Sequence, residues 1–233
     1  STAFVGARGT GNRVFALSPP VSGISIDSTT GVVSVATSAT AGSYKETVTV
    51  TDSVGSTAST TLNININLAI TISSGSGVTT TFGRADSSTA FTASGGTGTL
   101  VFSISPNVSG ITIDSSTGII YVAANTASGT YSETVTVTDS VSATAKVTTT
   151  IVVNAAMVIT SKSLSTTVGK SQSTGSFSVS GGTGSKRWSI TNYSGGTSVD
   201  TATGNVTISA AVAVGIYNET LTVTDSLNVS TSI

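Results

Sequence analysis

The most regular feature of the chain is an alternation of hydroxyl and aliphatic side chains. In Thr47-Val48-Thr49-Val50-Thr51 every second residue is aliphatic, the period of a strand with one buried and one solvent-facing side. Such runs are short and are separated by Gly, Ser, Asp and Asn, the residues of tight turns. Between positions 68 and 154 the pattern predicts strands at Ala69–Ser73, Val78–Phe82, Thr89–Thr92, Leu100–Ile104, Gly110–Asp114, Ile119–Ala123, Tyr131–Thr138 and Ala143–Val153.

This pattern occurs three times. Asp27, Asp114 and Asp200 lie 87 and 86 positions apart, and two other sets keep the same intervals: Tyr44, Tyr131 and Tyr217, and Asp52, Asp139 and Asp225. A unit of this length holds enough strands to close its own core, unlike the short repeats of a solenoid. We therefore expect an all-β chain of three tandem antiparallel β-sandwiches: repeat 1 (residues 1–67), repeat 2 (68–154) and repeat 3 (155–233).

The outer two repeats are expected to be incomplete. Aligned on repeat 2, repeat 1 begins at the counterpart of Ser88, and repeat 3 ends at the counterpart of Val147. The simplest account is a window from a longer tandem chain. The junctions Asn63–Leu68 and Val152–Ala156 contain no Gly or Pro. The last strand of each repeat is therefore expected to pass almost directly into the next repeat, which predicts a stiff array.

Composition excludes most enzymatic chemistry. The 233 residues include no Cys and no His, which excludes disulfides, thiolate nucleophiles, Cys/His zinc sites and Ser-His-Asp triads. We predict no catalytic residues, no cofactor and no enzymatic activity. With 9 basic and 10 acidic side chains, no basic face is available for nucleic acid or an anionic membrane. The longest apolar run, Ile151–Ile159, is too short to span a bilayer.

The acidic residues occupy three repeated positions, apart from Asp86. These are Asp27/Asp114/Asp200, Glu46/Glu133/Glu219 and Asp52/Asp139/Asp225. The first set opens an Asp-x-x-Thr-Gly segment and the last set opens the final hairpin. At both positions we expect the carboxylate to accept hydrogen bonds from nearby backbone amides and so to stabilise a turn.

The glutamate position is different. Along an unbroken strand Glu46 has the inward parity of Val48 and Val50, and an unpaired buried carboxylate is costly. The preferred interpretation places the carboxyl at the rim of the sandwich, hydrogen-bonded to backbone or hydroxyl groups, or turned outward by a bulge. A contact between repeats and a metal are the alternatives. Glu46, Glu133 and Glu219 are accordingly weak calcium candidates, and no metal site is predicted.

Most aromatic residues also recur with the repeat. We expect these nine to be core: Phe4, Phe91, Phe177, Phe15, Phe102, Trp188, Tyr44, Tyr131 and Tyr217. The remaining three are too scattered to form a sugar-binding platform. The Ser-Gly-Gly-Thr-Gly segments at Ser94 and Ser180 lead into strands, so they are interpreted as hairpin turns and not as phosphate loops.

Two motifs carry a family resemblance. Gly-x-Tyr followed by Thr-Val-Thr-Val-Thr-Asp-Ser, preceded by Ile-x-Ile-Asp-x-x-Thr-Gly-x-Ile, resembles the immunoglobulin-like and cadherin-like tandem repeats of large bacterial surface proteins, over the whole chain. The resemblance implies the β-sandwich fold. Cadherins hold calcium with acidic clusters at domain junctions, whereas both junctions here lack carboxylates. The fold is therefore expected to carry over without the calcium clamp.

The functional expectation is a non-catalytic structural or adhesive module. It would form part of an extracellular stalk, fibre or surface layer, with neighbouring repeats or other surface subunits as partners. The alternatives are a virion capsid or tail decoration and a non-catalytic appendage of a secreted hydrolase, because such modules serve all these roles.

Overall fold

A computed structural model describes residues 3–160, 162–191 and 195–233. The described residues form strands, turns and irregular segments without any helix, and accordingly no helical membrane span is found among them. The chain divides into two compact units, residues 3–69 with 95–97 and residues 70–94 with 98–233. Repeat 1 lies in the first unit and nearly all of repeats 2 and 3 in the second. The all-β fold expected from the alternation is confirmed.

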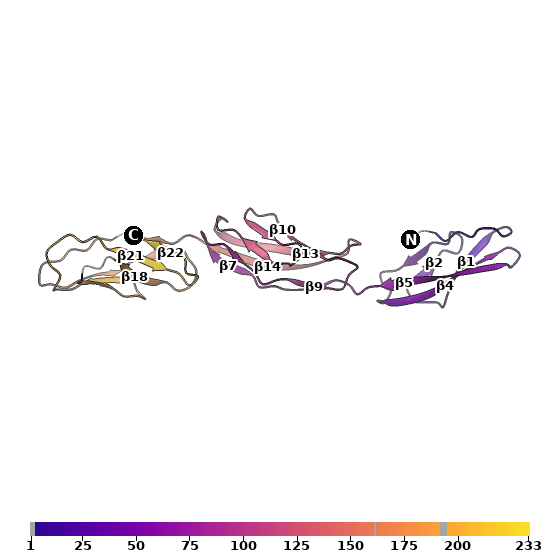
Figure 1. Cartoon of the computed structure of the whole chain (residues 1–233), viewed down its shortest axis with the longest axis horizontal. Helices are drawn as coiled ribbons and strands as arrows, with labels where there is room; N and C mark the ends of the chain where they lie inside the picture. Colours follow the sequence, from indigo (N-terminus) through magenta and orange to yellow (C-terminus); the bar gives the residue numbers. More distant parts are fainter. Residues whose placement is uncertain (1–2, 161, 192–194) are drawn as a thin grey trace. The chain divides into compact units, whose positions relative to one another are not determined.

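Repeat 2 consists of two sheets and a short strand pair (Figure 1). The larger sheet has the order β10 (Val101–Ser105), β13 (Gly129–Thr138), β14 (Thr144–Asn154), β7 (Val78–Thr81). The smaller sheet has the order β11 (Ile111–Ile113), β12 (Ile120–Val122), β8 (Asp86–Ser87), and β6 (Thr71–Ser73) pairs with β9 (Thr92–Ser94). β7 runs parallel to β14. The expectation of a wholly antiparallel sandwich is therefore wrong at this one strand pair.

The core of repeat 2 is filled by the inward residues of these strands. They are Val78, Phe91, Phe102, Ile111, Ile120, Val122, Val135, Val137, Ile151 and Val153. Val135 and Val137 alternate with half-buried threonines along β13, so the period-2 pattern directly gives the buried face. Closing this core is the main source of stability, since hydrophobic burial dominates folding.

The predicted strand Thr89–Thr92 is not formed as such. β8 pairs with β12 and β9 pairs with β6, so the chain crosses from one sheet to another between them. Phe91 lies at this crossing and is buried. Alternation cannot reveal such a crossing, because an inward residue is apolar whichever sheet it belongs to.

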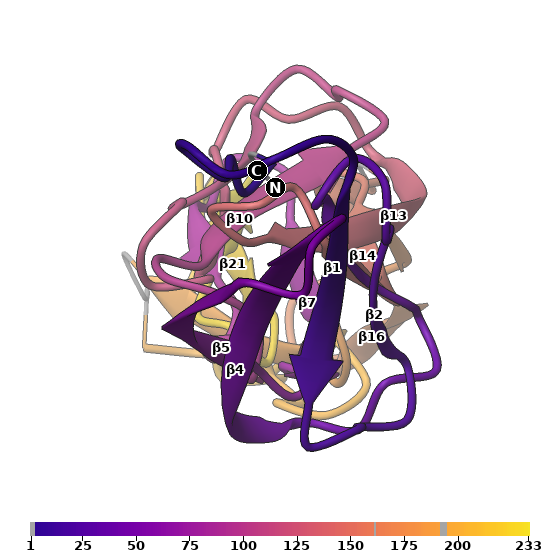
Figure 2. The same ribbon diagram turned by 90° about the vertical axis from the view of Figure 1, so that its right-hand side faces the viewer.

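Repeat 1 has the sheet order β1 (Arg13–Ser18), β4 (Gly42–Asp52), β5 (Thr57–Ile66), seen side by side in Figure 2, and a second pair of β2 (Ile24–Ile26) with β3 (Val33–Val35). Phe15 and Val48 are buried, whereas Ala58 and Thr60 of β5 are exposed. These two residues line an open hollow of ≈ 370 Å³. The corresponding residues of β14, Ala145 and Val147, are half-buried.

Repeat 3 has shorter strands. Its sheets have the orders β18 (Arg187–Thr191), β21 (Thr220–Thr224), β22 (Ser230–Ser232) and β16 (Gln172–Ser176), β20 (Asn205–Ile208), β19 (Thr197–Val199), and β15 (Val158–Ile159) pairs with β17 (Val179–Ser180). Residues 215–219, the counterparts of the first half of β13, lie outside any strand, and Ile216 is exposed. An open cavity of ≈ 660 Å³ lies beside this segment.

The recurring aromatic residues have two different roles. Phe15, Phe91, Phe102 and Trp188 are buried, as expected. Phe4, Phe177, Tyr44 and Tyr131 are half-buried, and of these Tyr131 and Phe177 pack against the cores of repeats 2 and 3. Tyr217 is exposed, so the core prediction is wrong there. The hydroxyl of each tyrosine donates to the carbonyl oxygen four residues earlier, at 2.8, 2.7 and 3.0 Å. This bond fixes the corner that leads into the strand, as in the tyrosine corner of other sandwiches.

Candidate functional site

The aspartates of the Asp-x-x-Thr-Gly segments are turn residues, as predicted. In repeat 2, Oδ1 of Asp114 accepts from the amides of Ser116 and Thr117 at 2.9 and 2.7 Å. Asp27 and Asp200 make the same pairs of bonds. These bonds, first among them the bond from Thr117, hold the pKa of Asp114 below its ordinary value. The side chains are therefore committed to local structure.

The glycine that ends this turn is required by its surroundings. Gly118 has φ +68°, and a Cβ there would lie 2.6 Å from the carbonyl oxygen of Phe91 and 3.1 Å from the ring of Phe102. Only glycine combines the left-handed backbone with this close approach. The turn thus links the Asp-x-x-Thr-Gly motif directly to the core.

The second set of aspartates organises the final hairpin of each repeat. Oδ1 accepts from the amides two and four residues further on: Val54 and Ser56 in repeat 1, Val141 and Ala143 in repeat 2, Leu227 and Val229 in repeat 3. In repeat 1, Oδ2 of Asp52 also accepts from the amide of Thr10 at 2.9 Å. The predicted turn role is confirmed at this position too.

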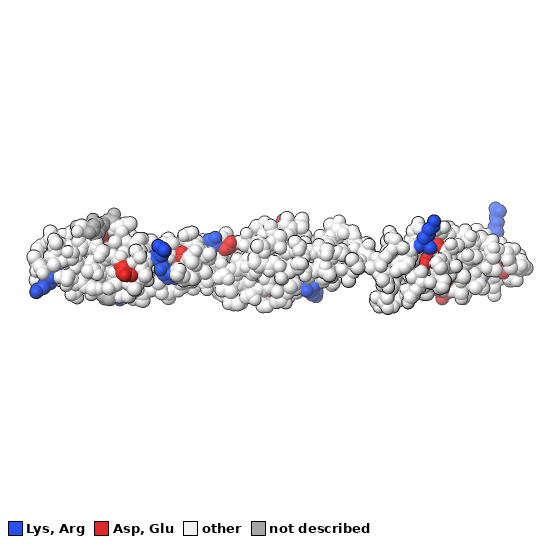
Figure 3. Space-filling model, turned by 90° about the horizontal axis from the view of Figure 1, so that it is seen from below, with Lys and Arg blue, Asp and Glu red and all other residues white. Residues whose placement is uncertain are grey.

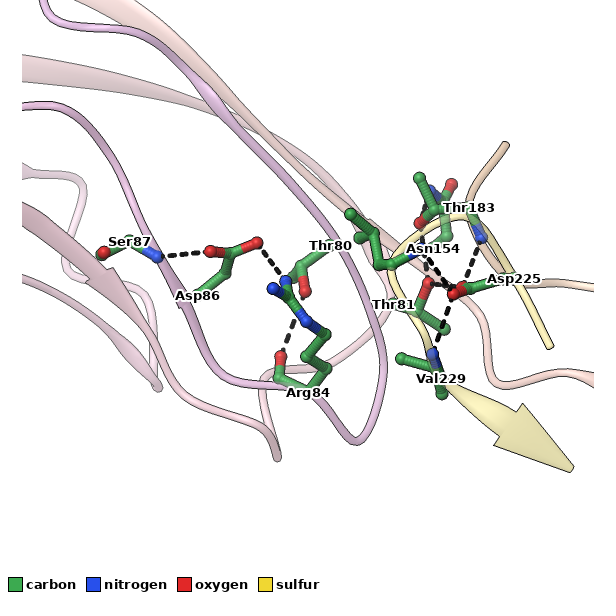
Figure 4. Close-up of polar contacts among 10 residues, drawn as sticks. Thr80, Thr81, Arg84, Asp86, Ser87, Asn154, Thr183, Asp225 and Val229 are labelled. Carbon is green, nitrogen blue, oxygen red and sulfur yellow. Dashed lines mark hydrogen bonds and ion pairs between the residues drawn. The ribbon is translucent and has the colours of Figure 1, made fainter. Parts of the chain in front are cut away.

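In repeat 3 the same carboxylate has an additional partner, from repeat 2. Oδ2 of Asp225 accepts from the amide of Thr183 at 2.9 Å and from the hydroxyl of Thr81 at 2.6 Å (Figure 4). Thr81 ends β7, 144 positions before Asp225. Asn154, at the end of β14, donates to Thr183 at 2.8 Å. Side chains of both repeats therefore meet at this boundary, although the junction itself contains no carboxylate.

The environment of Asp225 favours its charged form. The residue is 4% exposed, and burial alone would raise its pKa. The hydrogen bonds from Thr81, Thr183, Val229 and Leu227 outweigh burial and hold the pKa below its ordinary value. We call Thr81, Asn154, Thr183 and Asp225 the boundary cluster.

The repeated glutamates do not lie at a hydrogen-bonded rim. The pairing of β4 with β5 and of β13 with β14 continues through Glu46 and Glu133 without a bulge, and these side chains are 1% and 0% exposed. Neither carboxylate oxygen of Glu133 has a hydrogen-bond partner among the residues that the structure describes. Burial accordingly raises the pKa of Glu133. The rim placement and the outward bulge are wrong for these two residues, because strand parity is maintained.

Glu219 differs from the other two glutamates. It is half-buried, and its Oε1 accepts from the hydroxyl of Thr197 at 3.2 Å. The residue at the position of Thr197 is Ile24 in repeat 1 and Ile111 in repeat 2. Only repeat 3 therefore offers a hydroxyl at this position, and the expected hydroxyl bond is found there. Thr197 and Glu219 lie 22 positions apart in the chain. The alternation of hydroxyl and aliphatic residues does not indicate that two such distant residues are neighbours.

The described residues contain no cluster that suits a metal ion. No three of the acidic side chains described lie close enough together to hold one. Charged side chains are sparse on the face seen in Figure 3, and Arg84 and Asp86 form an ion pair with each other. Each of the two hollows is lined by a single repeat, and its apolar and hydroxyl lining is joined by a few charged side chains: Arg8, Arg13 and Asp52 in repeat 1, and Lys162, Lys170 and Glu219 in repeat 3.

No family model matches the chain, and no curated protein matches it. Similar solved structures are segments of cadherins, among them protocadherin gammaB7 EC3-6 (16% identity, TM-score 0.38, 95% of this chain), Drosophila N-cadherin EC1-4 (12%, 0.37, 100%) and mouse cadherin-23 EC22-24 (17%, 0.35, 91%). The chain spans 66%, 68% and 80% of these structures, respectively.

Proposed function

We propose that the chain is a non-catalytic structural segment of an extracellular tandem array, in which β-sandwich repeats divided at residues 67/68 and 154/155 form an adhesive or spacing stalk on a bacterial surface. The observation that carries the proposal is the use of the repeated carboxylates. The aspartates hold turns through backbone amides, as Asp114 does, and Asp225 also bonds across a repeat boundary. The carboxylates of these aspartates thus stabilise turns, and one of them also connects neighbouring repeats.

The surface is consistent with this role. Nine basic and ten acidic side chains in 233 residues leave a nearly neutral exterior, and the outward positions of β13 are mostly threonine. Such a surface is hydrated without attracting charged ligands. A stalk needs stability and extension more than a binding cleft.

The proposal is tested by stretching the full chain between its two ends in a force microscope. Sandwich repeats that bear load are expected to unfold in separate steps, since each has its own core. A chain that extends in one gradual, low-force transition would contradict a load-bearing role. A separate assay of the same sample against polysaccharide and peptide substrates is expected to show no turnover.

A further inference from the structure

The boundary cluster is a hydrogen-bond chain with a single direction. The one hydrogen of the Thr81 hydroxyl is donated to Oδ2 of Asp225 at 2.6 Å. The 2.7 Å contact between Thr81 Oγ1 and Thr183 Oγ1 must then run from Thr183 to Thr81. Asn154 Nδ2 donates to Thr183 Oγ1 at 2.8 Å and starts the chain. Each hydroxyl donates once and accepts once, and the chain ends on a carboxylate.

This arrangement is strong for its size. The terminal acceptor is charged, and hydrogen bonds to charged groups are about twice as strong as neutral ones. Bonds in series polarise one another. Thr81 is 0% exposed and Asp225 4%, so water competes little for these groups. The chain of bonds also passes between the repeats three times, from Asn154 to Thr183, from Thr183 to Thr81 and from Thr81 to Asp225.

The same geometry leaves no place for a cation. Four donors point at the carboxylate of Asp225: the amides of Leu227 and Val229 at Oδ1, and the amide of Thr183 and the hydroxyl of Thr81 at Oδ2. Hydrogen atoms occupy the directions that a metal would need. Calcium also requires six to eight oxygen ligands, and the other side chains of the cluster are neutral.

We propose that the boundary cluster is a metal-free latch. Through it Thr81 and Asn154, the last residues of β7 and β14 in repeat 2, recognise a following repeat that carries the Thr183–Asp225 pair. The partner class is thus a sandwich of the same repeat type. This inference rests on the proposed role as a tandem array and names how adjacent repeats are held.

Repeat 1 provides an internal comparison for this latch. It has the same pair, in which Asp52 accepts from the amide of Thr10 at 2.9 Å. Among the described residues, the hydrogen bonds to the Asp52 carboxylate come from repeat 1 itself. Asp52 is half-buried, whereas Asp225 is buried. The hairpin therefore forms without the latch, and the contact from Thr81 is an addition to it.

The test uses the full chain with two spin labels, at Ser132→Cys on β13 and Ser189→Cys on β18. Both positions are exposed strand residues, and the chain has no cysteine of its own. Pulsed electron spin resonance then measures the distance distribution between repeats 2 and 3. Thr81→Val removes the hydroxyl with little change in shape, Thr81→Ser restores it, and Thr79→Val is the control at an exposed position of β7.

The expected result is a narrow distribution in the parent chain, in Thr81→Ser and in Thr79→Val. In Thr81→Val the distribution broadens, and the ratio of docked to undocked molecules falls about tenfold. Adding calcium to chelated protein leaves every distribution unchanged. A Thr81→Val distribution as narrow as the parent's, a broad one in Thr81→Ser, or narrowing by calcium would each overturn the latch. None of these outcomes alters the force measurement, so the two proposals fail separately.

Discussion

Repeats 2 and 3 have a glutamate at the same position of the repeat, within β13 in repeat 2 and just before β21 in repeat 3, and its surroundings differ. Glu133 lies at 0% exposure, and both its oxygens lack a partner, with Ile111 at the position that offers a hydroxyl in repeat 3. Glu219 is half-buried and accepts from Thr197. A threonine in place of an isoleucine at one position therefore gives one oxygen of the carboxyl, Oε1 of Glu219, a hydroxyl partner in repeat 3.

A second difference concerns how far the strand extends. β13 is paired with β14 over Gly129–Thr138, whereas in repeat 3 only Thr220–Thr224 forms the corresponding strand. Ten buried apolar residues form the core of repeat 2, whereas five of the described residues form that of repeat 3, which borders an open cavity of ≈ 660 Å³. We therefore expect repeat 2 to have a larger free energy of unfolding than repeat 3. The buried carboxyl of Glu133 should make this difference smaller.

The largest expected effect comes from emptying the filled core. Phe102→Ala should destabilise repeat 2 by about 3–5 kcal/mol. The neighbouring Val101 points outward, so Val101→Ala should change stability by less than about 0.5 kcal/mol. Amide hydrogen exchange over residues 129–154 follows repeat 2, and the fluorescence of Trp188 follows repeat 3. Equal losses in the two variants would show that the assigned faces of β10 are wrong.

The comparison of Glu133 with Glu219 is tested by replacing each residue with leucine. Glu133→Leu should stabilise repeat 2 by about 1–3 kcal/mol at pH 7, because an unpaired buried polar group is removed. Glu219→Leu should bring no gain, because it breaks the bond from Thr197. The measurement is urea unfolding of the full chain with the same two readouts. A loss of stability in Glu133→Leu would mean that this carboxyl has a partner or a ligand.

The pH dependence of repeat 2 follows from the raised pKa of Glu133. In the unfolded chain a glutamate titrates near about 4.3, and in the folded chain burial raises this pKa. The protonated form is compatible with the core, so the full stability is present below the unfolded pKa and is lost as the pH rises through the folded one. Ile111→Thr, which copies Thr197, should reduce this loss. A pH-independent Tm between pH 4 and 7 would contradict the assignment.

The turn aspartates should respond to pH in the opposite sense. Hydrogen bonds from backbone amides, led by the Thr117 amide, lower the folded pKa of Asp114, so its contribution is present above the unfolded pKa of about 3.9 and is lost as the pH falls through the folded value. Asp114→Ala should lower the Tm at pH 7. It should also make the decrease of Tm toward low pH smaller than in the parent chain. Asp86→Ala, which removes a partly exposed ion pair with Arg84 and one bond from the amide of Ser87, serves as the comparison and should change the Tm less.

The smallest effect is expected at the tyrosine corners. Tyr131→Phe removes the bond to the carbonyl of Ala127 and should destabilise repeat 2 by about 1 kcal/mol. Tyr217 is exposed and its segment is not in a strand, so Tyr217→Phe should have a smaller effect on repeat 3. Thermal unfolding at one pH distinguishes the two. Equal effects would mean that the corner in repeat 3 is as well supported as that in repeat 2.

The sequence by itself determined most strands of repeat 2, the presence of three sequence repeats, and the turn roles of aspartates such as Asp114 and Asp225. These features depend on local periods and on bonds to residues two to four positions away, which the order of residues specifies directly. It also gave the inward parity of Glu133, although the cost of burying a carboxyl argued for the rim.

Only the tertiary structure decided the rest. The crossing at Phe91, the parallel pairing of β7 with β14, and the facing of Thr197 and Glu219 depend on which strands become neighbours. The bond from Thr81 to Asp225 joins residues 144 positions apart. Such contacts result from how sheets close over a core, and a pattern of period two contains no information about the partner of a strand.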